Sequence, residues 1–482
     1  MMRSLYSGVS GLKNHQTRMD VVGNNISNVN TTGFKSSRVT FSDTLSQTLS
    51  GASAPTENRG GTNPKQIGLG SATSAIDTLF TDGSVQSTGV NTDLCLSGNG
   101  LFIVKDGNLS YYTRNGNFKF DKEGYYVNSD GLKVQGWSAT TPGDAINTNG
   151  QPSEICIPAG KTMAASATKV ATFSKNLDAA EPRIDSMTVT YKDGTTEAVA
   201  PGTTTVVKVG QNGYNNKEVS SITLKMTDGT TTTETSGAFK LKNSKPKTTI
   251  ATIYDSLGNA HNVTIYMTKT KVDSNNGNEW TVSLDPAGSK QQTIKEADGT
   301  TTTVSMNDAT LQFDLNGGLK TGNGSATLKL TNGAGTGQTV NLTFDDVTQY
   351  AGSSTAFATT DGNAAGTLKS VSIDSNGVIT GTYTNGLNVQ EAQVAIAQFN
   401  NASGLTKTGN SLYTESNNSG TPNIGTISDL GCTVTPSSLE MSNVDMASEL
   451  TDMIVTQRGY QSNSKIITVS DELLETLINM KR

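Results

Sequence analysis

The side chains that could support catalysis or hold a cofactor are few and scattered along the chain. The two histidines, His15 and His261, are far apart in sequence, so a zinc site built on a histidine pair is not expected, and any Ser-His-Asp arrangement would depend on one of them. Residues 160–162 (GKT) match the end of a phosphate-binding loop, but Ile155 stands where that loop needs its first glycine. The Asx-rich run 273–278 lacks the spacing of an EF-hand calcium loop. We therefore expect no enzyme: no catalytic, cofactor-binding or metal site.

Composition argues against several other classes of protein. The net charge of −6 does not provide the basic face that a nucleic-acid partner requires. No apolar run approaches the roughly 18 residues of a membrane span, and the first residues lack the apolar core of a secretory signal. Three widely spaced cysteines do not indicate a disulfide framework. Cys95, between two leucines, is expected to act as a small hydrophobic residue in a strand.

The element that dominates the sequence pattern is a long helix predicted from Pro436 to Arg482. Ser437 with Glu440 three residues later reads as a capping box that starts it. A stripe of apolar residues recurs every seven positions: Leu439, Met446, Met453, Tyr460, Ile467 and Leu474. A repeat of 3.5 residues per turn keeps this stripe on one side, so the helix is built to pack on another helix.

The stripe is too thin to stabilise a helix of roughly 45 residues alone in water. Four residues after each stripe position, Leu450 and Ile478 are apolar, whereas the others are polar: Asn443, Gln457, Ser464 and Asp471. We interpret Gln457, Ser464 and Asp471 as positions that contact other subunits or water. The helix therefore needs partners.

A second helix with seven-residue spacing is predicted at the other end of the chain, over residues 3–29. Its stripe is Leu5, Leu12, Met19 and Ile26, flanked by Val22 and Val29. His15 is expected on the surface of this helix. One interpretation is an ordinary amphipathic helix that packs on its own domain. The matched stripes at both ends favour the other interpretation, in which the two terminal helices pair with each other.

Both ends of the chain resemble bacterial flagellar rod and hook proteins. The amino-terminal resemblance is carried by residues 7–12 (SGVSGL) and 20–35 (DVVGNNISNVNTTGFK), and the carboxy-terminal one by residues 442–446 (SNVDM) and 457–465 (QRGYQSNSK). These matches cover about the first and last 45 residues, and the resemblance fades toward the middle of the chain.

The stretch between the helices reads as short strands separated by turns, which is typical of β sandwiches and barrels. Asn115-Gly116, for example, predicts a hairpin. We expect a multidomain, mainly β chain with a terminal α-helical coiled coil. The predicted parts are a helical domain (1–32 and 436–482), an extended, irregular connector (33–74 and 425–435), an inner β domain (75–150 and 366–424, its part after 401 irregular) and an outer β domain (151–365), with a possible inserted β unit at 181–246.

The resemblance implies a structural subunit of the flagellar hook, a curved hollow tube that transmits torque from rod to filament. Its expected partners are further copies of itself, the rod and hook-filament junction proteins, the hook cap during assembly and the type III export apparatus, without nucleic acid or membrane insertion. The location implied is extracellular, after export without a cleaved signal peptide. The expected assembly interface consists of the apolar positions of the two helices: Leu5, Leu12, Met19, Val22, Ile26, Val29, Leu439, Met446, Leu450, Met453, Tyr460, Ile467, Leu474 and Ile478.

Two other functions remain open from sequence. A distal rod protein shares both terminal signatures but is expected to be shorter, and the large middle argues against it. A secreted β-rich adhesin or glycan-processing surface enzyme fits the middle alone and leaves the paired ends unexplained. Some hook proteins also link their subunits covalently through a lysine and a cysteine-derived dehydroalanine. Cys156 and Lys161 are candidates for such a link, which denaturing electrophoresis of assembled protein would reveal.

Overall fold

The computed structural model describes residues 2–55, 57, 59–141, 143–203, 205–211, 215–273, 275–296, 299–320, 325–331 and 337–480. The chain forms two compact units. The first joins both ends of the sequence, Met1–Lys161 and Leu368–Arg482, and the second is the continuous middle, Thr162–Thr367.

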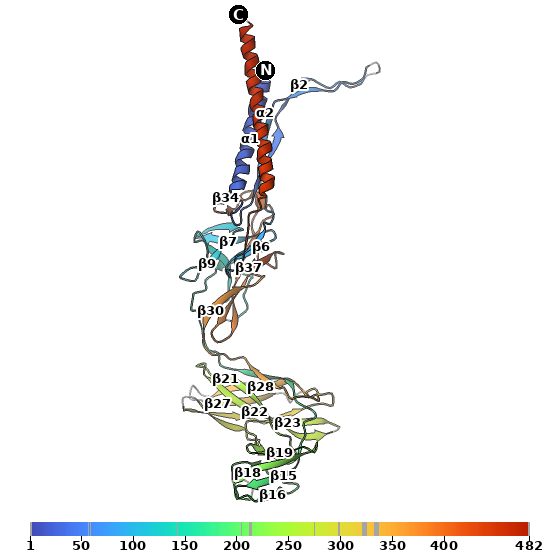
Figure 1. The fold of residues 1–482 in the computed structure, drawn as a ribbon, viewed down its shortest axis with the longest axis vertical. Coiled ribbons are helices and arrows are strands. Elements are labelled where there is room, and N and C mark those ends of the chain that lie inside the picture. The colour runs from blue at the N-terminus through green and yellow to red at the C-terminus, as the bar shows by residue number, and fades with distance from the viewer. Residues whose placement is uncertain are drawn as a thin grey trace. The chain divides into compact units, whose positions relative to one another are not determined.

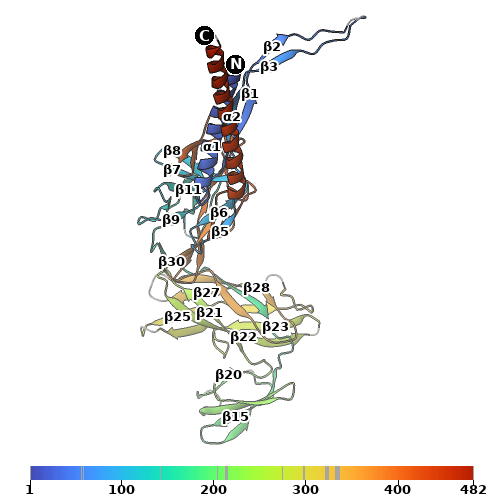
Figure 2. The same cartoon turned by 45° about the horizontal axis from the view of Figure 1, so that its top comes forward.

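Two long helices of the first unit run side by side (Figures 1 and 2). They are α1 (Met2–Ser27) and α2 (Met446–Asn479). Strands make up most of the rest of the chain. The prediction of a mainly β chain with paired terminal helices is therefore confirmed. The 34 residues of α2 make a rod of about 51 Å at about 1.5 Å per residue.

The predicted start of the second helix at Pro436 is wrong. Helix α2 begins at Met446, where the Asp445 side chain accepts a hydrogen bond from the Ala447 backbone N–H at 3.0 Å. The preceding residues form strands β37 (Thr433–Pro436) and β38 (Ser438–Glu440), which pair with β6 (Leu94–Ser97) and β5 (Val85–Ser87). Ser437 between them has a φ of 56°, a left-handed conformation that no helix N-cap adopts. The backbone groups that a capping box would satisfy are therefore bonded to distant strands.

The connector predicted as irregular over residues 33–74 is largely β structure. Strand β1 (Ser37–Asp43) pairs with β4 (Ser71–Thr78), and β2 (Ser46–Ser50) pairs with β3 (Lys65–Gly68). Figures 1 and 2 show the β2–β3 hairpin branching away from the helix pair. Few side chains of these strands are buried, so no apolar face had to be encoded in the sequence as an alternation of apolar and polar residues. Backbone pairing between the strands holds them.

The largest sheet has 14 strands, with a main path β13-β30-β31-β32-β11-β7-β8-β35-β34. Strand β7 (Gly100–Asp106) buries both faces, with Phe102 in one apolar cluster and Ile103 in another, because successive side chains of a strand point to opposite faces. Cys95 is buried in β6, as predicted. Its thiol pKa is raised to about 11, mainly by burial.

Two local predictions for this unit are wrong. The Asn115-Gly116 turn does not close a hairpin, since the strands on either side pair elsewhere; a Cβ at Gly116 would overlap the Leu94 carbonyl oxygen. The stretch after 401 is also not irregular, because it contributes three strands to the sheet. The remaining elements of the unit are β8 (Leu109–Thr113), β9 (Phe118–Phe120), β10 (Tyr126–Asn128), β11 (Lys133–Ser138), β12 (Ser153–Glu154), β30 (Gly366–Ile373), β31 (Val378–Tyr383), β32 (Asn388–Val394), β33 (Ile396–Gln398), η1 (Ala402–Gly404), β34 (Thr406–Gly409), β35 (Leu412–Thr414) and β36 (Asn423–Gly425).

The second unit contains a β sandwich. A six-stranded sheet, β24-β25-β27-β28-β14-β29, and a four-stranded sheet, β21-β22-β23-β26, share one apolar core that includes Phe173, Phe344 and Trp280. The strands of the sandwich are β14 (Val170–Asn176), β21 (Lys247–Tyr254), β22 (Ala260–Asp273), β23 (Gly277–Ser283), β24 (Gln291–Lys295), β25 (Thr301–Met306), β26 (Ala309–Gln312), β27 (Ser325–Thr331), β28 (Gln338–Thr348) and β29 (Phe357–Thr360). Strand β13 (Thr162–Met163) pairs with β30 in the 14-stranded sheet.

A separate apolar cluster lies within the stretch 184–241 of this unit, and includes Val189 and Ile222. It is built from a four-stranded sheet, β16-β15-β18-β19, and the strand pair β17-β20. These strands are β15 (Ile184–Tyr191), β16 (Thr196–Ala198), β17 (Val207–Lys208), β18 (Val219–Met226), β19 (Thr231–Glu234) and β20 (Ala238–Phe239).

Candidate assembly interface

The contact between α1 and α2 is antiparallel and close. A Cβ added at Gly11 would lie 2.8 Å from the side chain of Asn463, and one added at Gly459 would lie 2.5 Å from the His15 ring. Gly8 lies opposite Ile467, where an added Cβ would make an ordinary van der Waals contact at 3.5 Å. Successive contacts pair higher residue numbers of α1 with lower residue numbers of α2, so the two helices run antiparallel. The glycines, which cost helix stability, permit this close approach.

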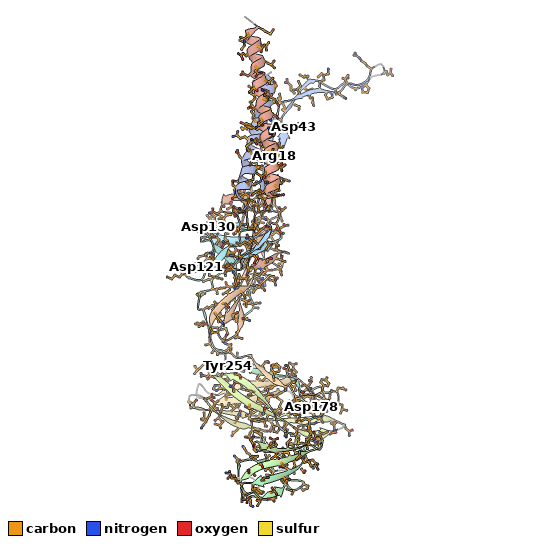
Figure 3. All side chains as sticks on the ribbon, viewed as in Figure 1. Arg18, Asp43, Asp121, Asp130, Asp178 and Tyr254 are labelled. Atoms are coloured by element: carbon orange, nitrogen blue, oxygen red, sulfur yellow. The ribbon has the colours of Figure 1, made fainter. Side chains whose placement is uncertain are left out.

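Polar side chains join α1 to α2 along the same contact, nearer the start of α2. The Arg18 guanidinium lies 3.0 Å from the Asp452 carboxylate, and Figure 3 places Arg18 where the two helices run together. Asn25 donates a hydrogen bond to Glu449 at 2.9 Å. Asn25 also donates to the Ser37 carbonyl at 2.8 Å, so it joins α1 both to α2 and to strand β1.

The seam therefore runs along one side of α1 at residues 8, 11, 15, 18, 22 and 25. This is heptad spacing, but the positions carry mainly glycine and polar residues. On α2, the buried residues are Thr456 and Ser470. The prediction that His15 lies on the helix surface is wrong: its ring packs against Gly459, and its Nδ1 atom is buried without a hydrogen-bond partner.

The predicted interface residues fall into three groups. Those partly or fully buried beside the seam are Leu5, Leu12, Met19, Val22, Ile26, Met453, Ile467 and Leu474. Val29 is half-buried just past the end of α1, and Leu439 is buried in β38, outside the helix. Those exposed to solvent are Met446, Leu450, Tyr460 and Ile478.

Further apolar side chains of α2 are exposed although they are not part of the predicted stripe: Ile454, Val455, Ile466, Val469, Leu473 and Leu477, together with the C-cap residue Met480. A helix that exposes apolar residues on more than one side is not satisfied by a single partner helix. The helix pair thus offers surface for contacts with other molecules.

A buried charge cluster lies below the helix pair, where the chain leaves α1 and returns toward α2. Lys35 Nζ lies 2.6 Å from Glu440 Oε1, and Arg114 Nη1 lies 3.2 Å from Glu440 Oε2; all three side chains are 1% exposed. Arg114 also lies 3.3 Å from the carboxylate of Asp82. The Gly83 backbone N–H donates to Glu440 Oε1 at 2.8 Å.

Glu440 is thus the shared acceptor of a buried site rather than a helix-capping residue. Burial lowers the pKa of the Lys35 ammonium, as does the neighbouring Arg114, while Glu440 acts in the opposite direction. The cluster joins the segment after α1 to the strand before α2. Sequence patterns did not identify it, because Lys35, Arg114 and Glu440 are far apart in the sequence and each reads as an ordinary surface charge.

Among the described residues, no three His, Cys, Asp or Glu side chains group together as metal ligands would. His261 is buried, with its Nδ1 atom 2.7 Å from Glu296 and its Nε2 atom 3.5 Å from Asp255. Lys161 pairs with Glu391 at 2.6 Å, and Cys156 is partly exposed. No helix within the described ranges is both long and apolar enough to cross a bilayer.

Four family models match the chain. They are "Flagella basal body rod protein" at residues 5–35, "Flagellar hook protein FlgE/F/G D1 domain" at 95–174, "Flagellar basal body protein FlaE D2 domain" at 223–363, and "Flagellar basal body rod FlgEFG protein C-terminal" at 435–480. A solved structure of the Helicobacter pylori flagellar hook protein FlgE2 matches with a TM-score of 0.48 and 17% identity, over 74% of this chain and 100% of that one.

Curated relatives match over the full length. The flagellar hook protein FlgE of Borreliella burgdorferi is 39% identical over 510 residues, and that of Treponema pallidum is 37% identical over 516, each covering 100% of both chains. FlgE of Salmonella typhimurium is 32% identical over 99% of this chain and 100% of its own. On this evidence the chain belongs to the flagellar hook protein FlgE family.

Proposed function

We propose that this chain is the structural subunit of the flagellar hook, which polymerises into a curved hollow tube and transmits torque from the rod to the filament. The observation that carries the proposal is the match to flagellar hook proteins along the whole chain. The helix pair supports it, because α2 keeps apolar side chains in water that further copies of the chain would cover.

Assembly in this proposal proceeds through the two terminal helices. Their exposed apolar residues, which are Met446, Leu450, Tyr460 and Ile478 of the predicted set and the additional exposed residues of α2, form the contacts between copies. The polar seam between α1 and α2 holds each pair together but buries few large side chains, so contacts with neighbouring copies supply much of the stability. The helices then order fully as the tube forms.

The proposal extends to partners and location. The chain is exported through the type III apparatus without a cleaved signal, is placed under a hook cap outside the cell, and joins rod proteins at one end and junction proteins at the other. It carries out no catalysis and needs no cofactor, nucleic acid or membrane insertion. These assignments follow from what membership in a hook-protein family implies.

The alternative functions have less support. A rod protein has a match over only part of the chain: the flagellar basal-body rod protein FlgG of Bacillus subtilis is 48% identical over 183 residues, which cover 36% of this chain and 69% of the relative. If the chain were an adhesin or a glycan-processing enzyme, the paired terminal helices would have no explained function.

Electron microscopy of the purified, assembled protein tests the function. We expect curved tubes, because copies related by a repeated contact build a helical polymer. Short straight rods would favour the rod protein instead. Persistent monomers under conditions that assemble a known hook protein would refute a role in polymerisation.

The second unit is proposed to set the curvature of the tube by sliding against its counterparts at polar contacts. Its removal is practical, since the Leu368 backbone N–H already donates to the Lys161 carbonyl at 2.9 Å. Replacing residues 162–367 with two glycines should leave tubes that assemble but differ in curvature in electron micrographs. Removing only 184–241, which leaves the core of the β sandwich in place, is the control that keeps most of the second unit. Unchanged curvature in the larger deletion would contradict the sliding mechanism.

A further inference from the structure

The stretch 184–241 of the second unit is joined to the β sandwich by two connecting segments, 177–183 on the way in and 242–246 on the way out. It has an apolar core of its own, distinct from the core of the sandwich, and we call it the inserted module. Figures 1 and 2 show its strand β15 set apart from β22 and β23 of the sandwich. A part with its own core can turn as one body unless a large apolar interface holds it.

The two connecting segments pair with each other where they meet the module. The Ile184 backbone N–H donates to the Asn243 carbonyl at 2.8 Å, and the Lys242 backbone N–H donates to the Ile184 carbonyl at 2.9 Å. Lys242 has a φ of 70°, a left-handed conformation that residues other than glycine rarely adopt. The module is therefore attached through a short two-stranded link with an unusual backbone conformation.

On the sandwich side of this link, the buried Lys269 of β22 holds both connecting segments. Its ammonium donates to the Ala179 carbonyl at 2.6 Å and to the Glu181 carbonyl at 3.2 Å, and the residue is 4% exposed. The Ser244 backbone N–H donates to the Lys269 carbonyl at 3.0 Å, and the Lys269 backbone N–H donates to the Ser244 hydroxyl at 2.9 Å. One lysine thus fixes the link to the sandwich.

A cleft of about 280 Å³ lies between the module and the sandwich. Ala238 and Phe239 of β20 line one side, and Thr268, Thr281 and Ser283 of β22 and β23 line the other. A second cavity of about 210 Å³ shares Phe239 with it. Because these sandwich residues present hydroxyl groups, which water can hydrogen-bond, widening the cleft exposes little of their apolar surface.

An ion pair spans the same joint. Lys208 of β17 lies 3.5 Å from the carboxylate of Asp285, which follows β23, and the two side chains are 37% and 27% exposed. Lys208 is paired across the strands with Ala238, which lines the cleft, so the ion pair lies beside the cleft. Partly exposed ion pairs are weak and are screened by salt.

We propose that the inserted module is a hinged body, which turns about the link held by Lys269 and is kept closed over the cleft by the Lys208–Asp285 ion pair. The device lies within one chain and does not depend on polymerisation. Breaking the ion pair opens the cleft without unfolding either core. Lys245 of the outgoing segment pairs with Glu234 of the module at 2.6 Å, which limits the range of the movement.

Double electron–electron resonance on the full-length monomer measures the opening. Spin labels are attached at two exposed positions, Lys225→Cys in the module and Lys329→Cys in the sandwich. Cys156→Ser removes the partly exposed native thiol, and the other two cysteines are buried. Lys208→Gln should raise the population outside the main distance peak about 2- to 5-fold, the range expected for an exposed ion pair.

Lys271→Gln is the matched control, because Lys271 pairs with Asp273 within the sandwich at 3.7 Å and should leave the distances unchanged. Added salt should shift the wild-type distribution as Lys208→Gln does and should have little effect on Lys208→Gln itself, since salt screens the ion pair. Unchanged distances in Lys208→Gln, or equal changes in the two variants, would overturn the hinge.

Trypsin tests the attachment, because Arg183 and Lys242 in the connecting segments are cleavage sites. Lys269→Met should speed cleavage there at least about 10-fold, since hydrogen bonds from a charged donor contribute enough free energy for that factor and cleavage follows the opened population. Lys271→Met is the control and should be cleaved at the wild-type rate. Equal rates in these two variants would overturn the role of Lys269.

The same digestion separates turning from local unfolding. Lys208→Gln should be cleaved in the connecting segments at the wild-type rate, because a hinged body moves with its link intact. Rapid cleavage in Lys208→Gln would show that the link unfolds and would overturn the hinge. The spin-label measurement does not use Lys269→Met, so it decides the proposal even if that variant fails to fold.

Discussion

Replacing Glu440 with alanine is expected to destabilise the first compact unit by about 3–5 kcal/mol, because it leaves the buried Lys35 ammonium without its counter-charge and the buried Arg114 with Asp82 alone. The Glu440 carboxylate accepts from Lys35 at 2.6 Å and from Arg114 at 3.2 Å, and no side chain of the three exceeds 1% exposure. Urea unfolding followed by tryptophan fluorescence measures the loss. With Trp280→Phe as background, the signal comes from Trp137, which is buried in the first unit.

An exposed ion pair of the same unit supplies the control. Lys133 and Glu154 lie 2.7 Å apart but remain 35% and 38% exposed, so water screens their interaction and Glu154→Ala should have a far smaller effect. Equal losses in the two alanine variants would show that burial does not give Glu440 its importance. A double-mutant cycle with Lys35→Met separates the direct pair from the rest of the cluster.

The Glu440 cluster shows which features a local pattern cannot reveal. Ser437 and Glu440 have the spacing of a capping box, yet both are committed to partners far away: the Thr88 backbone N–H donates to the Ser437 carbonyl at 2.9 Å, and Lys35 binds Glu440. A helix signal depends on neighbours within one turn, whereas a strand pair depends on a segment hundreds of residues distant. The helix start was therefore misplaced, although the helix itself was predicted.

The helix–helix seam shows the same limit in another form. Seven-residue spacing predicted two pairing helices, and they pair. The seam itself, however, lies on the glycine and polar positions beside the apolar stripe, because His15 needs the space that Gly459 leaves and Asn463 needs the space at Gly11. Fit between two particular surfaces is not encoded in the hydrophobicity of either helix alone. The polar strands β1 to β4 were missed for a related reason, since backbone pairing holds them without an apolar face.

Placing aspartate at both Met453 and Ile467 is expected to abolish tube formation while the β structure of both units stays folded. Both side chains are half-buried in the helix pair, and Ile467 faces Gly8. Each substitution removes about 1 kcal/mol or more of apolar burial and adds a carboxylate that must be desolvated on packing. This loss of contact energy recurs in every copy of the chain. A polymer held by weak repeated contacts is therefore expected not to form. Sedimentation of assembled material measures the polymer, and fluorescence of Trp137 and Trp280 reports the two units.

The matched control places aspartate at Gln461 and Thr468, which are exposed on α2. These changes add the same two charges to the same helix but remove no apolar contact, so tubes should persist. If the Met453 and Ile467 double variant also sedimented as wild-type polymer, the helix pair would not carry the assembly, and contacts between β domains would have to hold the tube. If both variants failed, charge on α2 rather than apolar packing would control assembly. Only loss in the first variant with retention in the second identifies the apolar residues of the helix pair as the part of the chain that builds the polymer.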